Sequence, residues 1–151
     1  MSNSRPNRHR RNIVLRMLAG MAFIAGGRVA SAQERPARPS APERRWFEAA
    51  VSMKRRAESW GDQSYGAVLV AAGELIGEGP SRVIQLGDPS AHAEREAIRD
   101  AQRRLGRVDL AGSILYSTSR PCRQCEIAAA QAQVARMYYG PLLNDAGQPR
   151  P

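Results

Sequence analysis

Three side chains of the kinds that bind metal ions lie at two predicted helix starts, 30 residues apart along the chain. His92 opens a stretch of helix-forming residues, and Cys122 and Cys125 open the next such stretch, directly behind Pro121. Two cysteines three positions apart on the first turn of a helix project their sulfurs to one side and can share a metal ion. The histidine, brought alongside by the intervening strand, supplies a third ligand. A metal site would therefore require the two helix starts to meet in the folded chain.

The number of ligands favours a catalytic zinc site over a structural one. Three protein ligands leave one position of a tetrahedral zinc ion open to water, whereas structural sites are closed by four ligands. Helix N-termini also favour a thiolate over a thiol. Glu94 lies two residues after His92, too close for a fourth ligand from the same turn, but well placed to exchange protons with water at the metal. We therefore predict one Zn²⁺ per chain on His92, Cys122 and Cys125, with Glu94 as the catalytic residue.

Each of these residues also has a simpler interpretation. A histidine at a helix start is more often a capping or hydrogen-bonded group than a ligand, and a glutamate in a first turn is ordinarily solvated. A C-x-x-C pair in an exported protein can be a redox disulfide, although that context places the pair after the first strand of the fold. Taken together, H-x-E followed by P-C-x-x-C matches the pattern of zinc nucleobase deaminases, which favours the metal site.

Periodic apolar residues predict one α/β domain over residues 43–143. An amphipathic pattern comes first, and two apolar runs around a glycine-containing turn predict a β-hairpin. Strands and helices then alternate, which predicts parallel pairing and helices layered on a central sheet. In chain order, the predicted elements are helix 43–59, strands 65–72 and 75–79, helix 91–105, strand 113–117, helix 122–134 and strand 136–140.

The formal net charge of +9 is concentrated at the N-terminus. Residues 1–32 contain six arginines and no acidic residue, whereas residues 33–151 carry a net charge of only +3. Arg10 and Arg11 precede a mostly apolar segment, and Ala-Ser-Ala at residues 30–32 has the form of a cleavage site. We therefore predict a signal peptide of the twin-arginine type over residues 1–32 and export to the periplasm. A Sec signal, or a basic tail on a cytoplasmic protein, is the alternative.

The other segments outside the domain are a short apolar stretch, a linker and a polar tail. The uninterrupted apolar stretch at residues 17–27 is too short for a stable membrane anchor, which takes about 20 residues. Residues 33–42 contain three prolines and are predicted to be a linker, and residues 144–151 are predicted to be a polar tail. A hydrophobic content of 42% excludes a disordered chain, and two cysteines are too few for a disulfide framework.

The domain resembles the cytidine deaminase-like superfamily, in the branch that holds tRNA adenosine, guanine and fungal-type cytosine deaminases. The resemblance covers about 95 residues and includes the zinc motifs and the segments GAVLV at 66–70, IGEG at 76–79, DPSAHAE at 88–94 and LYST at 115–118. It implies a three-layer α/β/α sandwich, zinc on His92, Cys122 and Cys125, and Glu94 as proton shuttle. It also implies that the backbone N–H of Ala93 contacts a ring carbonyl of the substrate.

The chain departs from that superfamily in three ways. Ser81 stands where the family usually has an asparagine that contacts base or sugar, and a hydroxyl offers one donor where an amide offers two. Arg120 stands where a glutamate usually precedes Pro-Cys, and its charge favours an anionic substrate group. Relatives continue with a further helix, a fifth strand and a closing helix, whereas this chain ends within about ten residues of its fourth predicted strand. We therefore expect a sandwich truncated after that strand, whose open edge favours a homo-oligomer.

These observations predict hydrolytic deamination of a free nucleobase or nucleoside of the cytosine, guanine or adenine type, with release of ammonia. Nucleic acid is not expected as a partner, because the predicted mature chain has a low net charge and an exported protein would meet little tRNA. Two alternatives stay open. One is an adenosine deaminase acting on tRNA or another nucleic acid, and the other is a catalytically inactive, zinc-stabilised binding module of the same fold.

Overall fold

The computed structural model describes residues 42–151. The predicted signal peptide at residues 1–32, and all of the predicted linker except its last residue, lie outside the described residues, so the signal, the linker and the export route stay predictions. Over the described range, no helix is both long enough and apolar enough to cross a bilayer.

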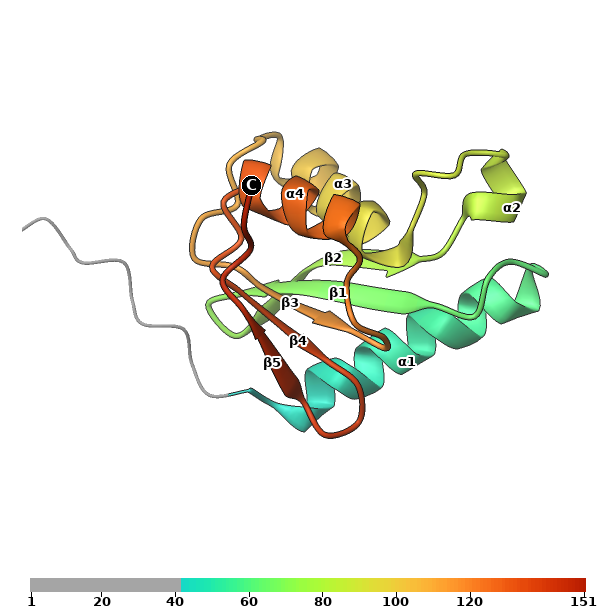
Figure 1. Ribbon diagram of the computed structural model, residues 1–151, viewed down its shortest axis with the longest axis horizontal. Coiled ribbons are helices and arrows are strands. Elements are labelled where there is room, and N and C mark those ends of the chain that lie inside the picture. The colour runs from blue at the N-terminus through green and yellow to red at the C-terminus, as the bar shows by residue number, and fades with distance from the viewer. Residues whose placement is uncertain (1–41) are drawn as a thin grey trace, which may run out of the picture. The chain divides into compact units, whose positions relative to one another are not determined.

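A mixed sheet of five strands, in the order β2-β1-β3-β4-β5, forms the centre of the domain (Figure 1). β1 and β2 form an antiparallel hairpin, β3 is antiparallel to β1, β4 is parallel to β3, and β5 returns antiparallel to β4. The elements are α1 (Arg44–Ser59), β1 (Gly66–Ala71), β2 (Glu74–Pro80), α2 (Val83–Leu86), α3 (Ala93–Leu105), β3 (Ile114–Ser117), α4 (Arg123–Gln131), β4 (Arg136–Tyr139) and β5 (Asn144–Gly147).

The predicted α/β class and the parallel pairing of β3 with β4 are confirmed, but the predicted end of the sheet was wrong. Residues 144–147, expected to be part of a polar tail, form β5 instead. Asn, Asp and Gly have low strand propensity, so no local signal marks this strand. Pairing with β4 and the ion pair between Arg136 and Asp145 hold it in place. The expected homo-oligomer concerns a second chain and stays a prediction.

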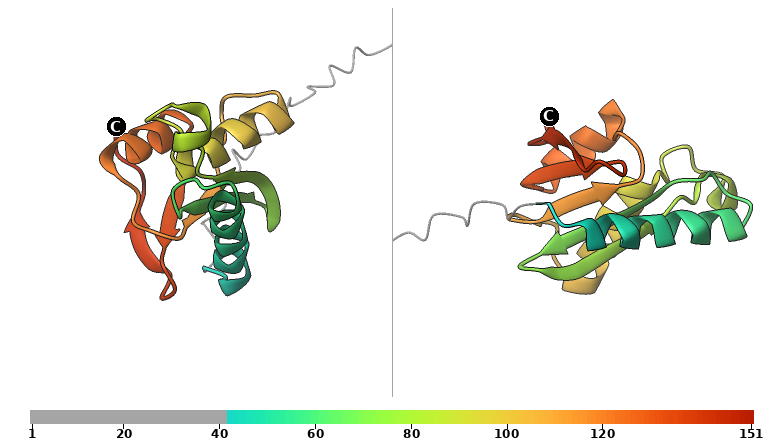
Figure 2. Two further views of the ribbon diagram at one scale, coloured as in Figure 1. Left: turned by 90° about the vertical axis from the view of Figure 1, so that its right-hand side faces the viewer. Right: turned by 90° about the horizontal axis from the view of Figure 1, so that it is seen from below.

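Helices cover both faces of the sheet, with α1 on one face and α3 and α4 on the other (Figures 1 and 2). Alternation along β1 determines which residues meet which helix, because successive strand side chains point to opposite faces. Val68 and Val70 belong to the buried cluster that includes Ala50 and Met53 of α1. Leu69 belongs to the cluster on the α3 and α4 face. This is the three-layer arrangement that the sequence predicts.

Glycines in the hairpin allow both helices to approach the sheet at backbone distance. A Cβ atom built on Gly66 would lie 2.2 Å from the carbonyl oxygen of Ala50 in α1. On the opposite face, a Cβ on Gly79 would lie 2.0 Å from the carbonyl oxygen of Ala93 at the start of α3, and one on Gly77 would also strike α3. The first turn of α3 can therefore lie directly against β2 only because these positions lack side chains.

We expect Gly79→Ala to lower the free energy of unfolding by about 2–3 kcal/mol, because the added methyl group must displace the backbone of α3. Gly87→Ala is the matched control, since Gly87 has a φ of +59° and open space around it, and only the left-handed backbone penalty of about 1 kcal/mol applies. Urea denaturation of the two variants measures the difference. Equal destabilisation of the two would show that close packing of α3 on β2 does not depend on Gly79.

Candidate metal centre and active-site pocket

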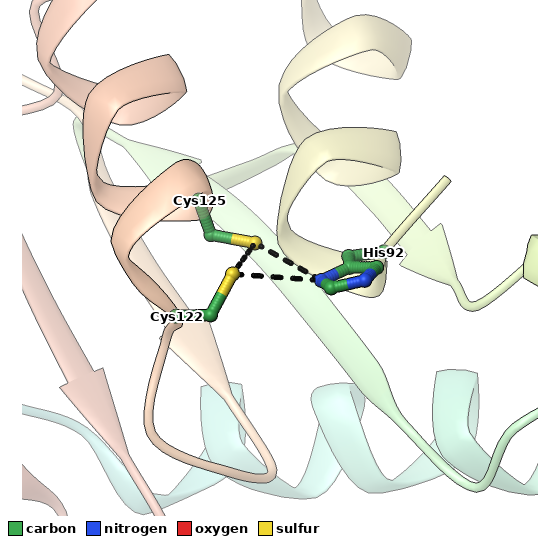
Figure 3. Close-up of side chains that lie close together, drawn as sticks. All are labelled: His92, Cys122 and Cys125. Atoms are coloured by element: carbon green, nitrogen blue, oxygen red, sulfur yellow. Dashed lines mark hydrogen bonds between the residues drawn. The ribbon is translucent and has the colours of Figure 1, made fainter. Parts of the chain in front are cut away.

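The structure brings the three predicted zinc ligands together at the starts of α3 and α4 (Figure 3). His92 is the N-cap residue of α3 and Cys122 is the N-cap residue of α4. Neither side chain makes a capping hydrogen bond to its own helix, so both are available as ligands. Cys125, in the first turn of α4, directs its sulfur to the same point. The capping interpretation of His92 is therefore not the one that the structure shows.

The distances from the histidine nitrogen to the two sulfurs fit a zinc ion. His92 Nδ1 lies 3.6 Å from Cys122 Sγ and 3.5 Å from Cys125 Sγ, and the two sulfurs are 3.3 Å apart. Zinc bonds of about 2.3 Å to sulfur and about 2.0–2.1 Å to nitrogen, at tetrahedral angles, separate a sulfur from a nitrogen ligand by about 3.6 Å. Both cysteines are free thiols. The donor set of one imidazole and two sulfurs, at this spacing, therefore suits zinc.

Burial opposes ionisation of one of these thiols. Cys125 is fully buried, and its burial, followed by the negative charge of Glu94, raises the pKa of the thiol. Burial and the nearby carboxylate therefore oppose the thiolate that the start of a helix favours at Cys125. A bound divalent cation reverses this balance, since a thiol that coordinates zinc is deprotonated. The chemistry of the site thus calls for a cation at this point.

Glu94 lies at the edge of the ligand cluster and is only 5% exposed. Ser117, the last residue of β3, donates a hydrogen bond of 2.7 Å from its hydroxyl to Glu94 Oε1. The other carboxylate oxygen, Oε2, lies 3.5 Å from Cys125 Sγ. One oxygen is thus held by the sheet and the other faces the metal ligands. The sequence predicted the place of Glu94 but assigned no role to Ser117.

A pocket of about 260 Å³ opens beside the ligand cluster. This volume approaches the lower end of the range for small-molecule sites, which begins at about 300 Å³. Buried residues form the floor and exposed residues form the rim. The lining residues are Gln63, Tyr65, His92, Ala93, Glu94, Ser119, Arg120 and Cys122.

Residues 40–141 match the family described as the cytidine and deoxycytidylate deaminase zinc-binding region. The chain belongs to this family. The match includes both helix starts and every residue that lines the pocket, so the His-Cys-Cys cluster is the zinc-binding site by which the family is described. The predicted zinc cofactor and the resemblance to cytidine deaminase-like proteins are confirmed.

Named members of this deaminase family are similar to the chain over its domain. A tRNA-specific adenosine deaminase from Agrobacterium fabrum is 39% identical over 95 residues, which are 63% of this chain and 62% of the relative. A guanine deaminase from Bacillus subtilis is 39% identical over 84 residues, which are 56% of this chain and 54% of the relative. The chain therefore spans less than two thirds of the length of these two relatives.

Solved structures of deaminases share the fold. One is a tRNA:A34 deaminase that performs A-to-I editing at the wobble position of transfer RNA, with a TM-score of 0.63, 38% identity and coverage of 65% of this chain and 71% of that one. The structure of the B. subtilis guanine deaminase has a TM-score of 0.62 and 34% identity, and the match covers 66% of this chain and 64% of that one.

Of the two predicted substrate contacts, Ala93 lines the pocket and Ser81 does not. Ala93 lines the pocket at the first turn of α3, where backbone N–H groups have no partner within the helix, and its contact with a ring carbonyl stays a prediction. Ser81 is fully buried and does not line the pocket. Its hydroxyl donates a hydrogen bond of 2.8 Å to Asp62 Oδ1, so the residue holds a loop instead of facing the pocket.

Asp62 anchors the loop before β1 to the segment after β2. It is 8% exposed and accepts hydrogen bonds from the Ser81 hydroxyl and from the backbone N–H groups of Gln63, Ile84 and Gln85. Burial acts to raise the pKa of this carboxyl group, but the donors, with Gln85 and Ser81 foremost, outweigh burial and lower the pKa. The carboxylate thus fixes the loop that carries Gln63 into the pocket lining.

Gln63 and Ser119 were not predicted from the sequence as pocket residues. Gln63 and Tyr65 lie in the loop between α1 and β1, far in sequence from either zinc motif. No local pattern connects that loop to the helix starts, because the connection comes from the pairing of β1 with β3. The position of Arg120 directly before Pro-Cys did signal its place beside the site.

We expect purified protein to contain one zinc ion per chain, and Cys122→Ser or Cys125→Ser to lower this content by at least about tenfold, because a hydroxyl is a poor substitute for a thiolate ligand. Gln124→Ser, at the exposed position between them, is the matched control and should retain zinc. Elemental analysis of dialysed protein measures the content. Full zinc occupancy in both cysteine variants would contradict this assignment of ligands.

We expect Asp62→Asn to lower the free energy of unfolding at pH 7 by about 1–3 kcal/mol. The side-chain NH2 group of asparagine would face O–H and N–H groups that donate hydrogen bonds to the carboxylate in the wild type. The folded-state pKa of Asp62 is lowered, so its contribution is complete above the unfolded pKa of about 3.9 and is lost as the pH falls through the folded value.

The difference between wild type and Asp62→Asn should therefore be larger at pH 7 than at pH 3 in urea denaturation. Asp109→Asn is the control, because Asp109 is exposed and accepts one hydrogen bond, from the backbone of Ala111, so a change within about 0.5 kcal/mol is expected. A difference for Asp62→Asn that is the same at both pH values would argue against the ionised carboxylate as the anchor.

Proposed function

We propose that the chain is a zinc-dependent deaminase that hydrolyses the exocyclic amine of an aminopurine and releases ammonia. The observation that carries this proposal is the Glu94 carboxylate, which is buried at the floor of the pocket and touches the edge of the ligand cluster. A buried acid beside a three-ligand metal site is the arrangement that hydrolytic metal chemistry needs. Membership of the deaminase family supports the same conclusion.

A zinc ion held by His92, Cys122 and Cys125 would lower the pKa of water to about 7 and so supply a nucleophile at neutral pH. We assign proton transfer to Glu94 Oε2, the oxygen that faces the ligand cluster. This atom takes one proton from water and passes it to a ring nitrogen, and it then takes the second proton of the same water, left on the new hydroxyl group, and passes it to the departing amine. The ring carbon gains the oxygen of water and loses its nitrogen as ammonia.

Ser117 positions Glu94 for this role. Its hydroxyl donates to Oε1, which leaves Oε2 beside the Cys125 sulfur at the ligand cluster. Ser117 is itself fixed in the sheet, where it pairs with Ala67 of β1 and Tyr139 of β4. The carboxylate therefore keeps its orientation while it gains and loses a proton, and little reorganisation accompanies the transfer.

Similarity to named relatives supports a purine as the base. Several relatives are tRNA-specific adenosine deaminases, and another is a guanine deaminase. Both names describe an amine on a purine ring. Adenosine within an RNA is our first candidate, and this replaces the expectation of a free base or nucleoside. Free guanine is the second candidate, because the guanine deaminase of B. subtilis has the same identity of 39% over its aligned residues.

We expect Glu94→Gln to retain zinc and to lower the rate of ammonia release by at least about 100-fold, because the amide keeps the shape of the side chain but cannot accept a proton. Glu48→Gln, on the exposed face of α1, is the control and should retain full activity. A coupled ammonia assay with adenosine, guanine and an adenosine-containing oligoribonucleotide measures the rates, and elemental analysis confirms the zinc content.

Turnover by Glu94→Gln at the wild-type rate would contradict the proposed proton transfer. If the zinc-loaded wild type releases no ammonia from any of these compounds, the deaminase proposal fails. The zinc-stabilised binding module is then the better description of the domain.

A further inference from the structure

We infer that Arg120 determines substrate choice by binding a phosphate group next to the base. This inference rests on the proposed function, since it concerns the substrate of the same pocket. Arg120 lies in the loop between β3 and α4, two residues before the metal-ligand candidate Cys122, and it lines the pocket. Its guanidinium is a permanent cation at the physiological pH range.

Exposure within the pocket runs from a buried floor to an exposed rim. Ala93 and Glu94 are buried, whereas Arg120 is exposed and Tyr65 is 46% exposed. A base that reacts beside Glu94 must present its amine to the floor. The rest of the ligand, which is sugar and phosphate where these are present, then extends out of the pocket past the rim. Arg120 is therefore placed to contact that part of the ligand and not the reacting amine.

The charge of Arg120 is available to a ligand. Within residues 42–151, the ion pairs between arginine and acidic side chains do not include Arg120. The neighbouring Arg123, by contrast, is engaged by Glu126 and by the backbone carbonyl groups of Arg150 and Pro151. The one carboxylate that lines the pocket, Glu94, is held by Ser117. An incoming anion thus meets no competing acid at Arg120.

The form of the pocket gives room for a ligand larger than a base. An open shelf of about 640 Å³, lined by Gln63, Ser64, Tyr65 and His92, shares three of these residues with the pocket and extends it outward. Guanidinium groups bind phosphate through paired hydrogen bonds, and Ser119 adds a hydroxyl beside Arg120 in the lining. A free base has no anionic group for this rim. A phosphate of a mononucleotide or of an RNA backbone supplies one.

The test compares substrates that differ in phosphate. Ammonia release is measured for adenine, adenosine, adenosine 5′-monophosphate and a short oligoribonucleotide with one adenosine, and for guanine, guanosine and guanosine 5′-monophosphate. The full zinc-loaded chain is used as wild type, Arg120→Gln, Arg120→Lys and Arg120→Glu. Arg55→Gln is the matched control, because Arg55 is an exposed arginine of α1 that does not line the pocket.

We expect phosphate-bearing substrates to exceed the nucleoside in kcat/KM by about tenfold in the wild type, the effect of one hydrogen bond to a charged group. Arg120→Gln should remove this advantage, Arg120→Lys should retain part of it, and Arg120→Glu should reverse it. Arg55→Gln should behave as wild type. An advantage shared by the mononucleotide and the oligoribonucleotide supports phosphate binding in general, and an advantage for the oligoribonucleotide alone identifies the RNA backbone as its source.

Equal effects of Arg120→Gln on all substrates, or no effect on any, would overturn the inference. Calorimetric binding of adenosine 5′-monophosphate and of adenosine separates this outcome from failure of the proposed function. If no compound releases ammonia but the monophosphate binds about tenfold more tightly than adenosine and loses this difference in Arg120→Gln, the phosphate site stands and the deaminase proposal fails. If ammonia is released and Arg120→Gln has no effect, the deaminase proposal stands and the phosphate site fails.

Discussion

The starts of α3 and α4 must lie within reach of one metal ion, and two features of the backbone bring them there. Parallel pairing of β3 with β4 makes α4 cross the sheet on the same face as α3. Gly77 and Gly79 let α3 lie against β2 at backbone distance, which sets the depth of its first turn. His92 and Cys122 then meet as the N-cap residues of α3 and α4. The position of the ligand cluster is thus a property of the sheet and helix layers themselves.

Charge balance explains why the same cluster needs a cation. Cys125 is fully buried and Glu94 nearly so, and the two groups lie in contact. In the absence of a cation, burial and the neighbouring carboxylate keep the Cys125 thiol protonated by raising its pKa. A zinc ion would offset the charge of two thiolates beside this carboxylate. The metal site and the proton transfer that we propose for Glu94 therefore share one pair of neighbouring side chains.

The parts of the site that were predictable from the sequence are those that local motifs encode. His92, Glu94, Cys122 and Cys125 lie on first turns of helices, where spacing alone fixes which side chains share a face. The positions of Gln63 and Ser81 were not predictable in this way, because Asp62 joins the loop before β1 to the distant segment after β2 through hydrogen bonds from Ser81, Ile84 and Gln85. The strand at residues 144–147 was missed for a related reason. Residues 144–147 have little intrinsic preference for a strand, and they form one because they pair with β4.

The reacting groups of the pocket lie on helix starts that local motifs predict, whereas the rim that contacts the rest of the ligand is formed by loops. The floor, with Glu94, and the metal ligands beside it come from helix starts that close packing against the sheet fixes. The rim comes from the loop before β1 and the loop before α4, and loops tolerate substitution far better than packed elements do. Asp62 holds the first of these loops, and Pro121 restricts the backbone of the second. The reacting groups thus rest on packed elements, whereas the contact that we propose between Arg120 and the rest of the ligand rests on a loop outside the zinc motifs.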